Sequence, residues 1–144
     1  LKPGGLFCQW LPLFQLTREQ FDAIARTFQE IFPDAFLVRG DFYCELPIVG
    51  LVGGRNFSQL DWQAIESMCN ALRNDSKTTD PLVRHADGVA MMLLGPLPEP
   101  GPGPRNTLAN AWLEWDAARN ILDVFDGTAD PGFYVNPEVF RRNA

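Results

Sequence analysis

A turn followed by a short, wholly apolar run constrains the fold of this chain more than any other feature of its sequence. The breaker residues Pro3-Gly4-Gly5 precede Leu6-Phe7-Cys8, and Gln9 and Trp10 follow this run. A turn that leads into a fully apolar run is typical of a strand that is buried on both faces of a sheet. Strands of that kind occur in parallel α/β sheets. We therefore expect a last parallel strand here, and we expect the sequence to begin partway through a larger α/β domain.

The next segment predicts an amphipathic helix from Thr17 to Phe32. Thr17 and Gln20 have the spacing of a capping box. Pro33 ends the helix, because the residue before a proline is pushed out of the α region. Apolar residues recur at helical spacing, at Phe21, Ile24, Ala25, Phe28, Ile31 and Phe32. We expect this stripe to lie in the core, with a polar face opposite it.

Two further apolar runs, residues 35–39 and 48–53, predict an antiparallel strand pair. The bridge between them is too short for the crossover that parallel strands need. A strand, a helix and an antiparallel pair form one end of a mixed α/β sheet, over residues 1–55. The segments from Leu11 to Leu16 should form a loop over the sheet edge, because Pro12 interrupts a regular central strand.

Residues 56–94 predict a helical segment. Ser58 should begin its main helix, with Asp61 at the third helical position. The expected buried stripe is Ile65, Met68, Cys69 and Leu72. Asp80 followed by Pro81 predicts the start of a second, short helix.

Residues 95–105 form a Pro/Gly-rich linker, since the ten residues 95–104 include five Pro and three Gly. This composition excludes a helix or a central strand and favours an extended spacer. A proline-rich ligand for an SH3 or WW module is the alternative. In the C-terminal extension, residues 106–144, Trp112 and Trp115 are three residues apart and cannot share a strand face. We expect an extended segment up to Trp115, with a shared helix face as the alternative.

Composition excludes several classes of function. The formal net charge of −6 argues against a nucleic-acid interface and against attraction to anionic membranes. It serves solubility, or it attracts a cationic small molecule such as a polyamine. Cys8, Cys44 and Cys69 are odd in number and lack CxxC spacing, so we expect reduced thiols in the cytoplasm and no metal site. No apolar run approaches the roughly 18 residues of a membrane span.

Three residues are candidate binding residues, and none is a candidate catalyst. Gln9 follows an apolar strand at the carboxyl edge of the expected sheet, where ligands bind in open α/β folds, although it can equally cap a loop backbone group. Tyr43 and Glu45 lie in the bridge of the strand pair, either lining a pocket or simply solvated. His85, the only histidine, has no partner in a triad motif.

The pattern as a whole resembles the spermidine synthase-like family, most closely its bacterial members, which are often fused to membrane segments. The resemblance rests on residues 1–13, on Ile31-Phe32-Pro33 and on Val49-Gly50-Leu51-Val52-Gly53. A weaker similarity covers Asn106-Thr107 and Trp112-Leu113-Glu114. It implies a class I methyltransferase-like Rossmann fold. Residues 6–9 would be its fifth strand, residues 17–32 the following helix, and the later strands its closing antiparallel pair.

The family transfers an aminopropyl group from decarboxylated S-adenosylmethionine to a diamine. Its catalytic aspartate and nucleoside-binding loop precede the matched region, so the resemblance implies a C-terminal fragment that is inactive by itself and holds no cofactor. Gln9 matches the glutamine of the family's Gln-Gly-Glu stretch near the diamine, but Trp10-Leu11 replaces Gly-Glu here. Tyr43 is loosely comparable with the family's tyrosine before the last strand.

Two other hypotheses stay open. The first is a non-catalytic interaction domain that forms a homo-oligomer through an open sheet edge at Leu6-Phe7-Cys8. The second is a part of an S-adenosylmethionine-dependent methyltransferase with the same fold.

Overall fold

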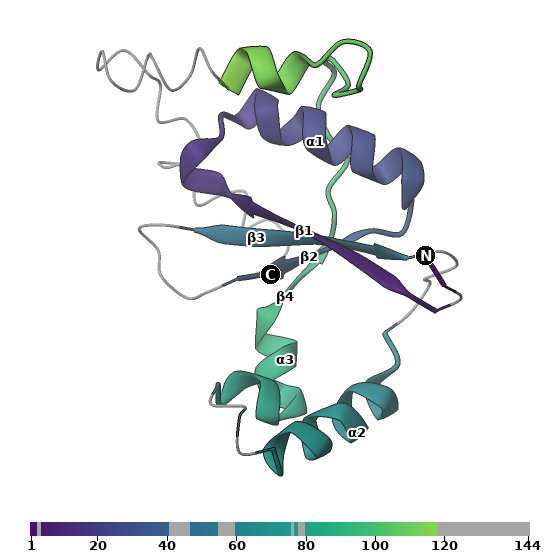
Figure 1. Ribbon diagram of the computed structural model, residues 1–144, viewed down its shortest axis with the longest axis vertical. Helices are drawn as coiled ribbons and strands as arrows, with labels where there is room; N and C mark the ends of the chain where they lie inside the picture. The colour runs from purple at the N-terminus through teal and green to yellow at the C-terminus, as the bar shows by residue number, and fades with distance from the viewer. Residues whose placement is uncertain (3, 41–46, 55–59, 76, 78–79, 118–144) are drawn as a thin grey trace.

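Four antiparallel strands form the sheet at the centre of the computed structural model (Figure 1). The structure describes residues 1–2, 4–40, 47–54, 60–75, 77 and 80–117. The strand order is β1-β3-β2-β4, with β1 Leu6–Pro12, β2 Phe36–Arg39, β3 Ile48–Gly54 and β4 Leu93–Pro96. On one side lie η1 (Leu13–Gln15) and α1 (Arg18–Ile31), and on the other lie α2 (Trp62–Arg73), η2 (Leu82–Arg84) and α3 (Ala86–Met92).

The first two strands and α1 form a crossover unit. Both β1 and β2 pair antiparallel with β3, so they run in the same direction, and β3 lies between them. The predicted antiparallel pair of residues 35–39 and 48–53 is therefore confirmed, as is a mixture of helices and sheet. A parallel pairing of residues 6–9 is not seen, because every strand pair among the described residues is antiparallel.

The helix α1 matches its prediction closely. The Thr17 Oγ1 atom accepts a hydrogen bond from the Gln20 backbone N–H at 3.3 Å, and Gln20 Oε1 accepts one from the Thr17 N–H at 2.9 Å, which completes the capping box. The predicted stripe buries Phe21, Ala25 and Phe28, whereas Ile31 at its end is exposed. The core between this helix and the sheet consists of Leu11, Leu13, Phe21, Ala25, Phe28, Ala35, Leu37, Val49, Leu51 and Leu97.

The strand β1 is not buried on both faces, contrary to the prediction. Leu6, Phe7 and Trp10 are 50%, 44% and 48% exposed. The strand lies at the edge of the sheet, so no described strand covers its outer side. Leu11 and Pro12 also belong to the strand, instead of starting the predicted loop over residues 11–16. An edge strand tolerates proline at a position whose N–H would point away from the neighbouring strand. Pro12 is such a position, because the N–H of the next residue, Leu13, points toward the β3 side and donates to the Pro47 carbonyl.

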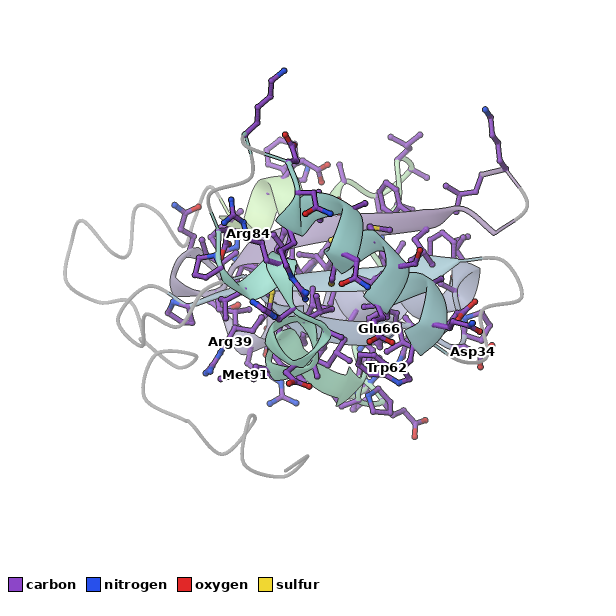
Figure 2. The ribbon with its side chains drawn as sticks, turned by 90° about the horizontal axis from the view of Figure 1, so that it is seen from below. Asp34, Arg39, Trp62, Glu66, Arg84 and Met91 are labelled. Atoms are coloured by element: carbon purple, nitrogen blue, oxygen red, sulfur yellow. The ribbon has the colours of Figure 1, made fainter. Side chains whose placement is uncertain are left out.

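The helices on the far side of the sheet begin differently from the prediction. Asp61 is the N-cap of α2, not its third residue, and its Oδ1 atom accepts a hydrogen bond from the Ala64 N–H at 3.0 Å. After Pro81 the 3-10 turn η2 forms in place of the predicted short helix, and the separate helix α3 follows from Ala86. Figure 2 shows this layer from below, with Trp62 on α2 and Met91 on α3. The helix α2 packs mainly on η2 and α3, so Cys69 is buried while Met68 of the same predicted stripe is exposed.

The Pro/Gly-rich segment is not a free spacer. Gly95 and Pro96 belong to β4, which the composition had not predicted, and Leu97 is buried in the core. Residues 112–117 are helical instead of extended, and this helix lies beyond α1, on the side away from the sheet (Figure 1). We call residues 97–117 the strap, because they run from the sheet across α1. Asn136 followed by Pro137 predicts the start of a last short helix, and this segment lies outside the described residues.

Candidate functional site

A groove with a volume of about 370 Å³ lies between β1, α1 and the strap. The walls are mostly apolar, with Gln9, Thr27 and Asn106 as the polar contributions. Its lining residues are Phe7, Gln9, Leu11, Ile24, Thr27, Phe28, Ile31, Phe32, Asn106 and Leu113. The groove thus combines residues from the start, the first helix and the far end of the described chain.

Three aromatic rings form one wall of the groove. The ring centroids of Phe7 and Phe28 are 6.1 Å apart, and those of Phe28 and Phe32 are 5.0 Å apart. These distances fall in the range that favours aromatic pairs. Gly53 pairs with Phe7 across the sheet, and a Cβ atom at Gly53 would lie 2.5 Å from Phe32. The glycine therefore lets Phe32 pack directly onto β3.

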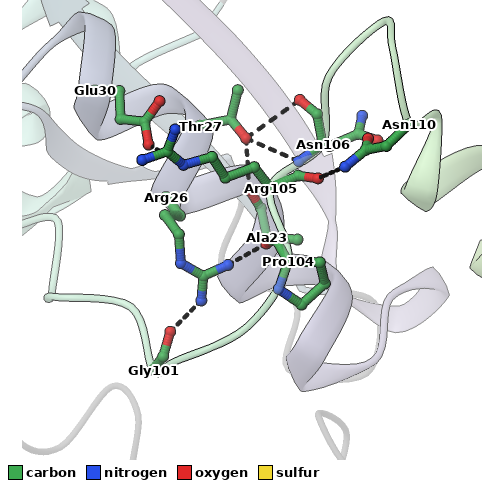
Figure 3. Close-up of polar contacts among 9 residues, drawn as sticks. All are labelled: Ala23, Arg26, Thr27, Glu30, Gly101, Pro104, Arg105, Asn106 and Asn110. Atoms are coloured by element: carbon green, nitrogen blue, oxygen red, sulfur yellow. Dashed lines mark hydrogen bonds and ion pairs between the residues drawn. The ribbon is translucent and has the colours of Figure 1, made fainter.

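The strap reaches the groove because the polar face of α1 binds it (Figure 3). The Arg26 guanidinium donates hydrogen bonds to the carbonyl oxygens of Gly101 and Pro104. Glu30 forms an ion pair with Arg105 at 2.6 Å. Prolines have no N–H, and an extended proline-rich segment makes no internal hydrogen bonds, so its carbonyl groups need outside donors. The side chains of α1 supply them.

Two further contacts place the strap residues that line the groove. The Thr27 Oγ1 atom accepts a hydrogen bond from the Asn106 N–H at 3.1 Å, and Asn106 Oδ1 accepts one from the Leu113 N–H at 2.9 Å. Gln20, fully buried, donates from Nε2 to Asp116 Oδ2 at 2.9 Å. The capping residue of α1 therefore also anchors the terminal helix of the strap.

The structure places one of the three predicted binding residues at this groove. Gln9 lines it, and its Nε2 atom donates to the Trp10 carbonyl oxygen at 3.2 Å. Tyr43 and Glu45 lie outside the described residues. His85 lies at the start of α3, exposed beside Arg73 and away from the groove.

Sequence reasoning missed Thr27 and Asn106. They are 79 residues apart, and each looks like an ordinary surface residue in its local context. No spacing rule connects a helix face to the carbonyl groups of a distant proline-rich segment. For the wall of the groove that α1 forms, the sequence pattern predicted only the apolar stripe of this helix.

The chemistry of the groove favours binding over acid–base catalysis. Among the described residues that line it, none has a carboxylate, thiol or imidazole group. Within the described residues no cluster of three or more His, Cys, Asp or Glu is arranged to hold a metal ion. None of the described helices has the length and apolar character needed to cross a membrane. The groove can therefore receive an apolar surface and a few hydrogen-bonding groups.

The outer side of β1, next to this groove, presents backbone groups that pair with no described strand, although the Trp10 carbonyl oxygen accepts a hydrogen bond from the Gln9 side chain. The Leu13 N–H donates to the Pro47 carbonyl at 2.9 Å, so by strand alternation the N–H and C=O groups of residues 7, 9 and 11 point toward β3. Those of Cys8 and Trp10 then point outward. No described strand lies on that side. The site therefore consists of an open strand edge with an apolar groove directly beside it.

Comparisons with protein families, with curated proteins and with solved structures find no match to this chain.

Proposed function

We propose that this chain is the C-terminal part of a spermidine synthase-like transferase, where it closes the sheet and forms one wall of the active-site region. The observation that carries the proposal is the crossover unit of β1, α1 and β2 with β3 inserted between the two strands. The resemblance implies a last parallel strand, a helix and a closing antiparallel pair. The observed order of elements agrees with that arrangement.

The exposure of β1 supports the same proposal. Its sequence, Leu6–Pro12, has no charged residue, yet several of its apolar side chains face solvent. Edge strands in soluble proteins usually have charges, bulges or short lengths that prevent further pairing. An uncharged seven-residue strand suits an interior position, with another strand of the enzyme on its outer side.

In this proposal the chain helps to position the substrate and supplies none of the reacting groups. In aminopropyl transfer the amine nitrogen of the diamine attacks the aminopropyl carbon attached to the sulfonium sulfur. The carbon–sulfur bond breaks, the thioether leaves, and a base accepts the amine proton. Catalysis of such a displacement depends largely on how the reactants are aligned. Gln9 at the groove is the residue of this chain that we expect to contact the diamine, while Trp10-Leu11 leaves no carboxylate beside it.

The test is an aminopropyl transfer assay with decarboxylated S-adenosylmethionine and putrescine. The 144-residue chain alone should show no turnover, and the longer gene product that contains it should be active. In that product Gln9→Ala should raise the KM for putrescine about tenfold, as expected for the loss of roughly 1.4 kcal/mol of ligand binding. Gln63→Ala, on the exposed side of α2, is the matched control. Turnover by the chain alone, or methyl transfer from S-adenosylmethionine instead, would contradict the proposal.

A second candidate function is dimerisation through β1. The absence of charge in this strand also suits self-pairing, because two copies would meet without repulsion. Light scattering over a wide concentration range tests this directly. A constant monomeric mass would exclude this candidate.

A further inference from the structure

We infer that the groove between β1, α1 and the strap selects an uncharged group that both donates and accepts hydrogen bonds, a primary amide or a hydroxyl, and that Asn106 sets this specificity. The inference rests on the proposed function in one respect, namely that the groove receives one end of the acceptor substrate. It adds the chemical class of the group at that end.

The first step concerns the orientation of the Asn106 side-chain amide. Its Oδ1 atom accepts a hydrogen bond from the Leu113 N–H at 2.9 Å. A backbone N–H can only donate, so the oxygen and the nitrogen of this amide cannot be exchanged. The Nδ2 atom donates to no described residue, and Asn106 lines the groove. The strap therefore offers a neutral N–H donor to a ligand in the groove.

The same reasoning orients Gln9 on the opposite wall. Its Nε2 atom donates to the Trp10 carbonyl oxygen at 3.2 Å, and a carbonyl oxygen can only accept. The Oε1 atom accepts from no described residue. The groove thus has a neutral acceptor on β1 and a neutral donor on the strap.

Thr27, the third polar residue of the lining, is already engaged in holding the strap (Figure 3). Its hydroxyl donates to the Ala23 carbonyl oxygen at 2.9 Å and accepts from the Asn106 N–H at 3.1 Å. A hydroxyl has a single proton to donate. Thr27 therefore fixes the position of Asn106 and has no donor left for a ligand.

The groove has no group that would compensate a charge on its ligand. Among the described residues of its lining none is charged, and the walls are mostly apolar. An ammonium has only donors, so it leaves Asn106 Nδ2 without an acceptor, and a carboxylate has only acceptors, so it leaves Gln9 Oε1 without a donor. Either ion also loses hydration against the apolar walls. A primary amide offers a donor to Gln9 and an acceptor to Asn106 and has no charge to desolvate.

For the proposed reaction, the groove then holds the end of the acceptor that does not react. A nitrogen whose lone pair accepts a hydrogen bond from Asn106 cannot attack at the same time. A diamine has to place its non-reacting nitrogen there in the uncharged form, which is costly near neutral pH. An amine with an amide at this end avoids that cost and should bind more tightly than putrescine.

The first test measures binding of three planar probes of nearly equal shape to the 144-residue chain. Benzamide is neutral, benzoate is an anion with acceptors only, and benzamidinium is a cation with donors only. Benzamide should bind with a dissociation constant on the order of 1 mM, at least about tenfold more tightly than either ion. Two-dimensional amide NMR measures the three constants. The side-chain amide resonances of Asn106 should shift as benzamide is added, which locates the probe in the groove.

Asn106→Asp changes the groove by one group. One carboxylate oxygen can still accept from the Leu113 N–H, while the other replaces the Nδ2 donor by a charged acceptor. The preference should invert, with benzamidinium bound at least about tenfold more tightly than benzamide. Asn70→Asp is the matched control, because it adds the same charge at an exposed position of α2 and should leave the order of the probes unchanged. Equal binding of the three probes, no binding of benzamide, or an unchanged order in Asn106→Asp would each overturn the inference.

A second readout uses the aminopropyl transfer assay with the longer gene product. The KM for 4-aminobutanamide should be at least about tenfold below the KM for putrescine, and Asn106→Asp should reverse this ratio. Transfer to both acceptors with equal KM values would disprove the inference and leave the proposed function intact. Selective binding of benzamide by a protein without aminopropyl transfer would disprove only the proposed function.

Discussion

The two edges of the sheet are built in opposite ways. The strand β4 has four residues, ends at Pro96 and pairs with β2 through an irregular register near Leu37. The chain then leaves the edge through the buried Leu97 and continues into the strap. In contrast, β1 has seven residues in regular register with β3 and exposed apolar side chains, although, like β4, it contains no charged residue.

This difference indicates which edge of the sheet is protected against pairing with a further strand. Short length, irregular pairing and proline are the devices by which proteins protect a sheet edge from further pairing. The edge at β4 has all three. The edge at β1 has only Pro12, at the very end of the strand. Among the described strands, the β4 edge is therefore protected against further pairing, and the β1 edge is not.

The largest expected effect is a difference in stability between substitutions at the β4 edge and at the β1 edge of the sheet. Leu37→Ala removes a buried side chain of β2, next to β4, and should lower the free energy of unfolding by about 2–5 kcal/mol. Phe7→Ala on β1 should cost about 1 kcal/mol, because the ring is half exposed and little of its burial is lost. Urea unfolding of the 144-residue chain measures both values. A cost for Phe7→Ala equal to that for Leu37→Ala would mean that β1 is already covered.

The sequence predicts local features of this fold well. The capping box of Thr17 and Gln20 depends on contacts within one helical turn, and the structure has it as predicted. The antiparallel pair of β2 and β3 follows from a short bridge and two apolar runs. The end of α1 before Pro33 also depends on neighbouring residues only. In each case the pattern and the interaction that stabilises it lie in the same stretch of chain.

The features that sequence analysis missed depend on distant partners. The apolar run of β1 predicts burial, but burial depends on neighbours that are not among the described strands. Gly95-Pro96 predicts a linker, yet both residues belong to the edge strand β4. Proline is tolerated in an edge strand where its missing N–H would point away from the neighbouring strand. Of the site, the sequence indicated Gln9 and the apolar stripe of α1. The wall formed by Asn106 and Leu113 could not be predicted, because it exists only when the strap is bound to α1.

The next prediction tests how the strap, which follows the protected β4 edge, is anchored. Gln20→Ala removes the side chain that completes the capping box and binds Asp116. It should lower the free energy of unfolding by about 1–3 kcal/mol, because the Thr17 N–H loses its partner and a cavity forms around a fully buried position. Gln63→Ala on the exposed face of α2 is the control and should change stability by less than about 0.5 kcal/mol. Equal, small effects would show that the contact with Asp116 is not maintained in solution.

A smaller effect is expected for the middle of the strap. Arg26→Ala removes the donors to the carbonyl groups of Gly101 and Pro104. The contact with Gly101 is partly buried and the one with Pro104 is exposed, so the cost should be about 1 kcal/mol. Amide hydrogen exchange at Asn106, whose N–H donates to Thr27 Oγ1, should speed up, while exchange within β3 should not change. Arg18→Ala, which breaks an i,i+4 ion pair with Asp22 on the same helix, should cost at most about 0.5 kcal/mol and leave the strap unaffected.

The smallest effect concerns the pH dependence of the thiol at the open edge. The Cys8 Sγ atom lies over Gly50, where a Cβ atom would be only 3.0 Å away, and the Trp10 ring is equally close to that point. This partial burial raises the pKa of the Cys8 thiol, because desolvation disfavours the thiolate. The native chain therefore retains this proton to higher pH than the unfolded chain does. The stability associated with Cys8 is complete below the unfolded thiol's pKa and is lost as the pH rises through the native pKa.

Reaction with a small disulfide measures this directly, because only the thiolate reacts. In the Cys44→Ser chain, the midpoint of the rate against pH should lie above that of N-acetylcysteine. Trp10→Ala, which lets water reach the sulfur, should bring the midpoint back toward this reference. A strand added beside β1 would desolvate the thiol further, so the midpoint should rise again in the longer gene product. A midpoint at or below the reference in the 144-residue chain would mean that the thiol is fully hydrated, and that Cys8 reports nothing about whether the edge of β1 is covered.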